Sequence, residues 1–282
     1  MLYIVATPIG NLGEMSRRAL DVLNAVDFVA AEDTRRTGLL LNAFGIKKPL
    51  IGYRKHNERA VSEQIADRLA GGEDGALVSD AGMPLISDPG SVLVETLIGR
   101  GLPYTVVSGP CAVINALVLS GLSAERFLMI GFLPEKAIDR RRLMEKYAEV
   151  EATLVVYSPP HNVLDDLAFL AEALGPRRYA VVREMTKVHE EVIRGVLGEP
   201  ADFTVKGEMV IVIEGARDKA ARLTDELSVE EHVRRYLDAG LDEKEAIKRT
   251  AADRHVAKSV VYAAYLSFRQ ERKVGPKKGS KE

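Results

Sequence analysis

Residues 2–31 read LYIVATPIGNLGEMSRRALDVLNAVDFVAA and contain an apolar run, an amphipathic segment and a second apolar run. The runs Leu2–Ala6 and Val26–Ala31 are rich in β-branched and other apolar side chains, and they predict two buried strands. Between them, Met15–Ala25 places its apolar side chains on one face, which predicts a helix. A strand, a helix and a strand in this order predict parallel strands joined by a right-handed crossover.

The same alternation continues toward residue 108. Ala76–Ser79 and Tyr104–Ser108 are further apolar runs, and Glu58–Ala70 is a further amphipathic segment. Strands that are apolar throughout and alternate with helices are typical of α/β proteins, in which helices cover both faces of the sheet. We therefore expect an α/β fold that begins with a mainly parallel sheet.

Beyond Gly121 the predicted strands lie closer together along the chain. They are Phe127–Leu133, Ala152–Tyr157, Tyr179–Arg183, His189–Val196 and Met209–Glu214. The stretch from Val182 to Ile213 leaves no room for a long helix between its two strands, which favours antiparallel pairing. We expect a second α/β domain with a mixed sheet.

Residues 228–268 have a helical pattern interrupted by a turn at Ala239-Gly240-Leu241. Asp242 and Glu245 resemble a capping box at the start of a second helix, and a third runs from about Val256 to Phe268. The helices form either a helix-turn-helix or a small bundle that packs on the second domain. The predicted domains are thus residues 1–118, 119–222 and 223–282.

The composition is that of an ordinary folded chain. Its 282 residues are 46% hydrophobic and 28% charged, which excludes a disordered or collagen-like protein. The single cysteine and five scattered histidines argue for a reducing compartment and against a structural metal site. The sequence has no signal-peptide pattern and no apolar run long enough to span a membrane, so we expect a cytoplasmic protein.

Charge is unevenly distributed along the chain. The net charge is −2, but residues 269–282 carry six Lys or Arg and two Glu. This basic tail either contacts phosphate or is a solvated terminus.

Loops rich in glycine, proline and small polar residues follow four of the predicted strands. Because the carboxyl ends of parallel strands share one edge of a sheet, these loops predict a ligand cleft at that edge. The loops are Thr7–Gly13, Glu32–Arg36, Asp80–Gly90 and Gly109–Ala112. No GxGxxG, GxxxxGK[ST] or GxSxG motif accompanies them, which argues against nicotinamide, nucleotide triphosphate and serine-hydrolase chemistry.

The loop Ser79–Gly90 is the strongest local signal. Its prolines and glycines fix the backbone, which suits backbone groups directed at a ligand. In the alternative interpretation, Asp80 caps a turn and Asp88 caps a helix that begins near Pro89.

These segments resemble the ribosomal RNA small subunit methyltransferase I family, over residues 2–268. The resemblance lies in the motifs LYIVATPIGNL (2–12), AEDTR (31–35), HNE (56–58), SDAGMPLISDPG (79–90), SGPCA (108–112), GFLP (131–134), REMTK (183–187) and KGEMV (206–210). It implies the tetrapyrrole-methylase fold, a homodimer, and S-adenosylmethionine-dependent 2′-O-methylation of a cytidine in small-subunit rRNA. The substrate would be either naked rRNA or the 30S particle.

The resemblance also implies a set of cofactor-binding residues between two α/β domains. The N-terminal loops would supply Pro8, Gly10, Asp80, Ala81, Gly82, Pro84, Asp88, Gly90, Gly109, Pro110, Cys111 and Ala112, and the second domain Tyr157, Gly207 and Met209. By itself, Cys111 is better interpreted as a small packing residue at a turn. The chain departs from the family at Ser158-Pro159-Pro160-His161-Asn162, where relatives commonly have Glu after the aromatic residue and His-Arg further on.

A ribose hydroxyl must lose its proton, so a nearby acceptor is expected. The candidates are Glu32, Asp33, His56, Asp80, Glu184 and Lys187, of which we predict Glu32, Asp33 and Lys187 as catalytic. Substrate contacts are predicted for Arg35, Arg36, His56 and Asn57. The alternatives are a capped, salt-bridged helix start for Asp33 and its neighbours, a structural His56, and an ordinary surface pair for Glu184 and Lys187.

RNA binding requires positive charge, and three groups of basic residues are candidates for it. They are Lys136, Arg140, Arg141, Arg142 and Lys146; Arg17, Arg18, Arg35, Arg36, Arg54 and Lys55; and Lys244, Lys248, Arg249, Arg254 and Lys258. Each group is also explained as a solvated helix face. Two other functions stay open: a methylase of the same fold acting on a tetrapyrrole or a protein, and a non-catalytic nucleic-acid-binding protein that senses a small ligand.

Overall fold

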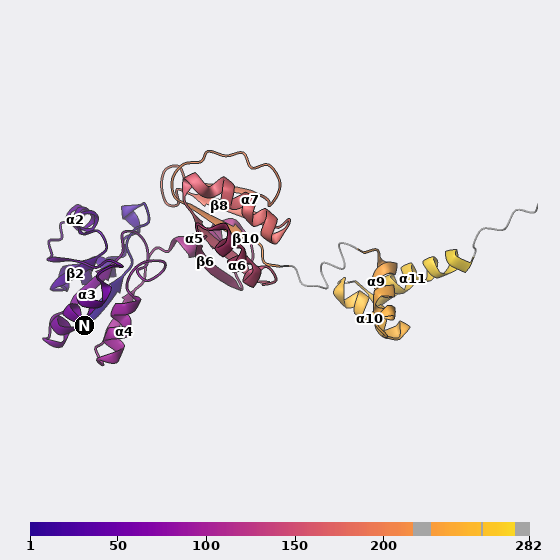
Figure 1. Cartoon of the computed structure of the whole chain (residues 1–282), viewed down its shortest axis with the longest axis horizontal. Helices are drawn as coiled ribbons and strands as arrows, with labels where there is room; N and C mark the ends of the chain where they lie inside the picture. Colours follow the sequence, from indigo (N-terminus) through magenta and orange to yellow (C-terminus); the bar gives the residue numbers. More distant parts are fainter. Residues whose placement is uncertain (217–226, 255, 274–282) are drawn as a thin grey trace, which may run out of the picture. The chain divides into compact units, whose positions relative to one another are not determined.

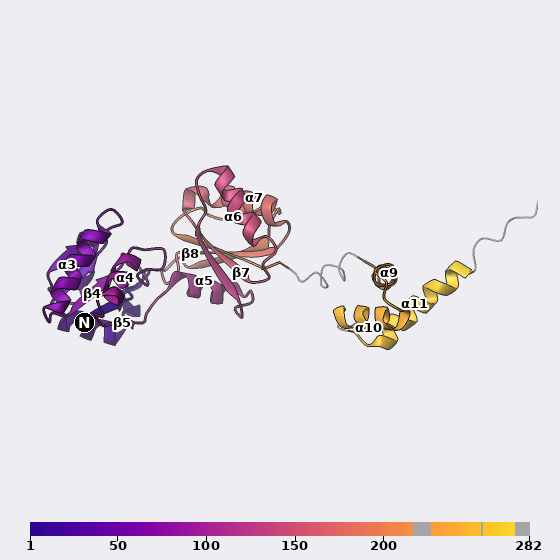
Figure 2. The ribbon, with the colours of Figure 1, turned by 60° about the horizontal axis from the view of Figure 1, so that its bottom comes forward.

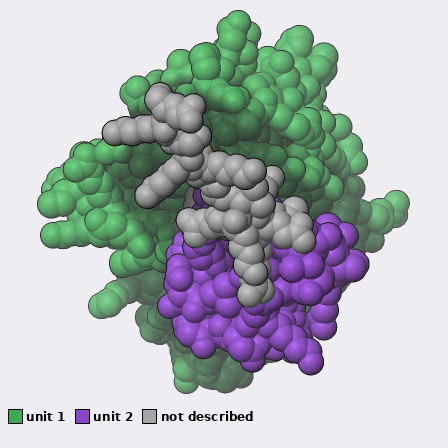
Figure 3. Space-filling view, turned by 90° about the vertical axis from the view of Figure 1, so that its right-hand side faces the viewer, with its two compact units in different colours: residues 1–215 green, residues 216–282 purple. Residues whose placement is uncertain are grey.

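The computed structural model describes residues 1–216, 227–254 and 256–273. The chain divides into two compact units, Met1–Gly215 and Ala216–Glu282, which Figure 3 shows in different colours. The first unit contains both sheets and the second contains the C-terminal helices (Figure 1).

The first sheet has five parallel strands in the order β3-β2-β4-β1-β5. The strands are β1 (Leu2–Val5), β2 (Phe28–Ala31), β3 (Leu50–Gly52), β4 (Gly75–Val78) and β5 (Tyr104–Val107). The helices that follow them are η1 (Leu12–Glu14), α1 (Arg17–Ala25), α2 (Thr34–Ala43), α3 (Glu58–Ala70), α4 (Ser91–Gly99) and α5 (Ala112–Ser120). The predicted parallel α/β sheet is confirmed.

Helices cover both faces of this sheet because its central strands are buried throughout. On one face, Leu23 of α1 and Leu41 of α2 pack on Val29. On the other, side chains of α3 and α4 pack on Phe28. The sheet therefore exposes its ends rather than its faces to ligands.

The second sheet is mixed, with the order β6-β7-β10-β8-β9. Its strands are β6 (Phe127–Phe132), β7 (Thr153–Ser158), β8 (Arg178–Arg183), β9 (Glu191–Val196) and β10 (Met209–Ile213). Strands β6 and β7 are parallel, and the other pairs are antiparallel, which confirms the predicted mixed sheet.

Helices also cover both faces of the second sheet. Helices α6 (Ala137–Tyr147) and α7 (Val163–Leu174), the latter preceded by the short η2 (Pro160–Asn162), pack on one face. Helix α5 packs on the other, where Ala116 and Leu117 contact a cluster that includes Val155 and Val210 (Figure 2). Because α5 directly follows β5, it joins the first sheet to the second.

The second unit contains α9 (Val229–Asp238), α10 (Glu243–Asp253) and α11 (Lys258–Lys273). Ser228 and Glu231 form a complete capping box at α9, whereas at α10 only the Asp242 carboxylate caps, by accepting from the Glu245 amide. The basic tail predicted at 269–282 lies outside the residues whose side chains the structure describes. Within the described segments, no helix is long and apolar enough to cross a membrane.

Candidate active site

The loops after β1 and β4 are fastened to each other at the carboxyl edge of the first sheet. The Thr7 amide donates to the Gly82 carbonyl over 2.9 Å, and the Gly82 amide donates to the Thr7 carbonyl over 3.0 Å. The buried Thr7 hydroxyl also donates to the Ser79 carbonyl over 3.2 Å. These bonds give the predicted ligand loop a fixed backbone.

The rest of the loop is held in an unusual conformation. Leu85 and Ser87 have positive φ angles of 72° and 68°, which non-glycine residues rarely adopt. Helix α4 begins at Ser91, and its N-cap is Gly90, with φ 144°, so the alternative of Asp88 as the helix cap is wrong. The Asp88 carboxylate is thereby left for another role.

A buried hydroxyl compensates for the missing side-chain cap. The Tyr53 hydroxyl, which is 1% exposed as a residue, accepts from the Leu93 amide in the first turn of α4 over 3.1 Å. It also shares a 3.1 Å hydrogen bond with the Ser62 hydroxyl. Nothing in the local sequence indicated this contact, because the partners lie 40 residues apart.

A cavity of about 380 Å³ lies against this loop and the second sheet. Five of the predicted cofactor residues line it: Ala81, Asp88, Ala112, Tyr157 and Met209. The other lining residues were not named individually as cofactor residues, although Ile86 and Ser87 lie in the predicted Asp80–Gly90 loop; they are Ile9, Ile86, Ser87, Phe132, Ser158, Pro159, Pro160, Met185, Glu208 and Val210. The remaining predicted cofactor residues do not line this cavity.

The cavity combines an aromatic pair with a carboxyl group. The rings of Phe132 and Tyr157 have centroids 5.2 Å apart. Burial raises the pKa of Tyr157 to about 12, and Cys111 and Asp88 add to the effect, so its phenol is neutral. Burial likewise raises the pKa of Asp88 to about 6, against a hydrogen bond with Ser79, and the Glu32 and Asp80 carboxylates raise it further.

A smaller hollow of about 140 Å³ borders the same loop through Ser79 and Asp80. Pro8, Gly10 and Arg36 also line it. Gly10 was predicted to bind cofactor and Arg36 to bind substrate. The structure therefore brings members of both predicted sets to one depression.

The carboxylates beside this hollow differ in their environments. The Asp33 carboxylate caps α2 by accepting from the Arg35 amide over 2.9 Å, as in the capped-helix alternative, and this bond holds the pKa of Asp33 below its usual value. Burial and the neighbouring Asp80 raise the pKa of Glu32. Asp80 accepts from the Asp33 amide over 3.1 Å and pairs with Arg36 over 3.3 Å.

Lys187 lies in a hairpin between β8 and β9 and reaches the N-terminal loops. Its ammonium pairs with Glu184 over 2.9 Å and with Glu208 over 3.5 Å. The hydrogen bond from the Lys187 ammonium lowers the pKa of Glu184. A Cβ on Gly10 would lie 2.7 Å from Lys187 Cγ, so the lysine stem lies against the Gly10 backbone.

The two polar residues after β3 differ in their surroundings. His56 is exposed. The Asn57 side chain holds the turn, because its amide donates to the Gly52 carbonyl over 3.1 Å and its oxygen accepts from the Arg54 amide over 2.7 Å. Asn57 is thus engaged structurally at this loop.

Two of the basic residues that were predicted to bind RNA form ion pairs or hydrogen bonds with other residues of the fold. Arg140 is 16% exposed and pairs with the buried Asp166. Arg254 donates to His232 and to the Leu227 carbonyl in the helical unit. Both are better explained as structural residues than as contacts to phosphate.

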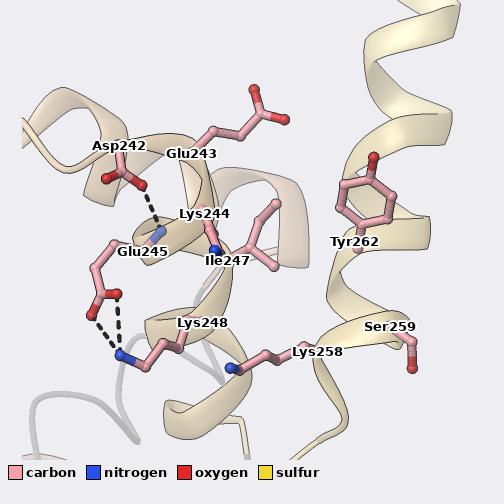
Figure 4. Close-up of a pocket in the computed structure, with 9 residues that line it drawn as sticks. All are labelled: Asp242, Glu243, Lys244, Glu245, Ile247, Lys248, Lys258, Ser259 and Tyr262. Carbon is pink, nitrogen blue, oxygen red and sulfur yellow. Dashed lines mark hydrogen bonds and ion pairs between the residues drawn. The ribbon is translucent and has the colours of Figure 1, made fainter.

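The helical unit contains a groove of about 710 Å³ between α10 and α11 (Figure 4). Lys244, Lys248 and Lys258 line it, but so do three acidic residues, Asp242, Glu243 and Glu245. The Lys248 ammonium lies 3.2 Å from both Glu245 oxygens. The lining is therefore balanced in charge.

Comparisons with known proteins identify the family. A family model described as Tetrapyrrole (Corrin/Porphyrin) Methylases matches residues 1–201. Proteins named ribosomal RNA small subunit methyltransferase I from Halalkalibacterium halodurans and Bacillus subtilis are 42% and 39% identical to the chain over 271 and 273 residues. Each match covers 94% of this chain and 94% of the relative. The chain belongs to the ribosomal RNA small subunit methyltransferase I family.

Solved structures show the same fold. A uroporphyrin-III-C-methyltransferase from Thermus thermophilus matches with a TM-score of 0.54 at 21% identity, over 76% of this chain and 93% of that one. A diphthine synthase matches with a TM-score of 0.55 at 14% identity, over 76% and 89% of the two chains. Membership of the methyltransferase I family confirms the expected fold and identifies the chain as a methyltransferase.

Proposed function

We propose that this member of the methyltransferase I family methylates the ribose 2′-hydroxyl of a cytidine in small-subunit rRNA, with S-adenosylmethionine as the donor. The observation that carries the proposal is the identity of 42% and 39% to proteins of that name over 94% of the chain. The proposed setting is the cytoplasm, where the substrate is the rRNA or the 30S particle.

The cavity fits this cofactor in size and in lining. Its volume of about 380 Å³ falls in the range of roughly 300–1,000 Å³ usual for small-molecule sites. Phe132 and Tyr157 offer aromatic rings to a purine, and Asp88 offers a carboxyl group to a cationic ligand. When bound, S-adenosylmethionine supplies an electrophilic methyl group on a sulfonium.

The residues predicted at the cofactor but absent from the cavity lining support the site indirectly. Gly82 forms the bridge to Thr7, and Gly90 caps α4. A Cβ on Gly109 would lie 3.0 Å from the Ala6 Cβ, so glycine permits close packing beside β1. We propose that these residues fix the loops that bind cofactor.

The hollow beside Asp80 is the proposed place of the ribose. Of the adjacent carboxylates, Glu32 is the better proton acceptor near neutral pH, because its pKa is raised whereas that of Asp33 is lowered. Lys187 places a positive charge near Gly10, where it would stabilise a developing alkoxide. Alignment of the two reactants supplies the larger share of the acceleration, up to about 7–11 kcal/mol.

Exposed cations near the hollow are the proposed RNA contacts. The Arg35 side chain is 89% exposed and that of Arg36 is 71% exposed. Lys136 and Arg142 are also exposed, at the start of α6 and within it. If they bind phosphate, their loss lowers affinity and flattens its dependence on salt.

Exposed apolar side chains support the proposed homodimer. Tyr104 and Val106 on the edge strand β5 are 39% and 46% exposed, and Val118 on α5 is 70% exposed. Exposed apolar residues on an edge strand and the following helix favour pairing with a second surface. Sedimentation of the purified chain at several concentrations tests this state.

The proposal is tested by transfer of tritium from methyl-labelled S-adenosylmethionine to small subunits from cells that lack this gene. Label at one cytidine, with the adjacent phosphodiester resistant to alkali, is the expected result. The Lys187→Ala variant should lose at least about tenfold in turnover and keep its cofactor affinity. Cofactor binding without RNA labelling would refute the rRNA assignment and favour a tetrapyrrole substrate, a protein substrate or the sensor function.

A further inference from the structure

A buried ion pair joins α6 to α7, the two helices on one face of the second sheet. One Asp166 oxygen, Oδ1, lies 2.9 Å from the Arg140 guanidinium. The Asp166 side chain is 2% exposed, and the Arg140 side chain is 16% exposed. Burying such a pair is costly unless further hydrogen bonds satisfy its remaining atoms.

Each partner makes a further hydrogen bond, Asp166 with a residue that lines the cavity and Arg140 with a residue two positions beyond a lining residue. The Ser158 hydroxyl donates to Asp166 Oδ2 over 2.6 Å. Arg140 Nε donates to the Pro134 carbonyl over 2.6 Å. The four residues thus form a continuous chain, Ser158–Asp166–Arg140–Pro134.

The ends of this chain lie beside the two aromatic residues of the cavity. Ser158 directly follows Tyr157 at the end of β7, and it lines the cavity itself. Pro134 lies two residues beyond Phe132, the last residue of β6. Since a guanidinium and a carboxylate hold fixed bond directions, the chain sets the spacing between the ends of two adjacent strands.

We propose that Arg140 and Asp166 are positioning residues, which hold the Phe132–Tyr157 ring pair in the geometry that binds the adenosyl cofactor. The inference rests on the proposed function, because it takes the cavity as the cofactor site. It also assigns a role to Ser158, whose hydroxyl forms the end of the chain that lines the cavity.

The decisive variant is Arg140→Lys, which keeps the positive charge but cannot bond Asp166 and Pro134 in the same fork. Its matched control is Arg141→Lys on the same helix, since the Arg141–Glu172 pair is about two-thirds exposed on both sides. Calorimetry with S-adenosylhomocysteine measures affinity directly, without RNA. We expect the Kd of Arg140→Lys to rise about tenfold and that of Arg141→Lys to be unchanged.

A double-mutant cycle separates positioning from general loss of stability. Combining Arg140→Lys with Phe132→Leu should raise the Kd by much less than the product of the two single effects, because the arginine acts through that ring. Independent effects would instead multiply and overturn the proposal, as would an unchanged Kd in Arg140→Lys.

Turnover provides a second readout. At saturating S-adenosylmethionine, Arg140→Lys should keep its kcat within about twofold, since the bound geometry is recovered once the cofactor orders the rings. If Arg140→Lys instead lost as much in kcat as it is expected to lose in cofactor affinity, and its KM for the cofactor were unchanged, positioning of the rings would be refuted. Absence of binding by the unmodified chain would refute the proposed function and this inference with it.

Discussion

Asp88→Asn should stabilise the protein at neutral pH. The pKa of Asp88 is raised from 3.8 to about 6, mainly by burial, with Glu32 and Asp80 adding to the effect and Lys55 opposing it. Between these two pH values the folded chain holds a proton that the unfolded chain has lost, so stability falls as the pH rises through this window. Above it, the folded state carries the cost of a charged, partly buried carboxylate.

The size of this effect on stability follows from the difference between the ordinary pKa of Asp88, 3.8, and its raised pKa of about 6. At about 1.4 kcal/mol per pH unit, it corresponds to about 3 kcal/mol. Asp88 is only partly buried, and solvent screening reduces this figure to about 1–2 kcal/mol. Asparagine has a similar shape and carries no charge at any of these pH values, so it avoids the cost.

The assay is urea unfolding of the wild-type chain and of Asp88→Asn at pH 4.5, 5.5 and 7.5. The gain in unfolding free energy should be small at pH 4.5 and reach about 1–2 kcal/mol at pH 7.5. The matched control is Glu95→Gln, at an exposed position of α4, which should show no such growth. A difference between Asp88→Asn and wild type that is the same at all three pH values would refute the reasoning.

Three further changes test the loops around the site. Gly207→Ala should lower stability by about 1–3 kcal/mol in urea unfolding, because residue 207 has φ +81° and the new Cβ would overlap the Glu184 carboxylate. Asp33→Ala should lower the free energy of unfolding by about 1 kcal/mol through loss of the α2 cap, whereas Asp33→Asn keeps the cap. Equal stabilities of these two variants would contradict the capping role. Tyr53→Phe should cost about 1–3 kcal/mol, since the buried Leu93 amide loses its acceptor, and an unchanged melting temperature would argue against it.

The sheets were predictable because their strands are buried in continuous apolar runs. Strand β4, for example, is buried at each of its four positions. Strand β3 was missed because Leu50–Gly52 is only three residues long and half-buried, which leaves no distinctive pattern. Edge strands of this kind form because a neighbour offers hydrogen-bonding groups, and the sequence of the strand alone does not show that neighbour.

The site was predictable to the extent that its residues share one loop. The Ser79–Gly90 loop carries Ala81 and Asp88 into the cavity, and its composition alone indicated a rigid backbone. Phe132 and Met185 were missed as lining residues because they come from separate places in the other half of the unit, Phe132 from the end of β6 and Met185 from the turn after β8. The ion pair of Arg140 was not predicted either, since its partner Asp166 lies 26 residues further along the chain.

The contact between the Lys187 stem and Gly10 links the choice of residue at two positions 177 apart in sequence. A side chain at position 10 would meet Cγ of Lys187 at 2.7 Å and Cε at 2.9 Å. Among sequences selected for stable folding, and not for activity, from a library randomised at both positions, alanine at 10 should therefore occur with a shorter residue at 187. The two positions would therefore vary together, because each side chain limits the size of the other.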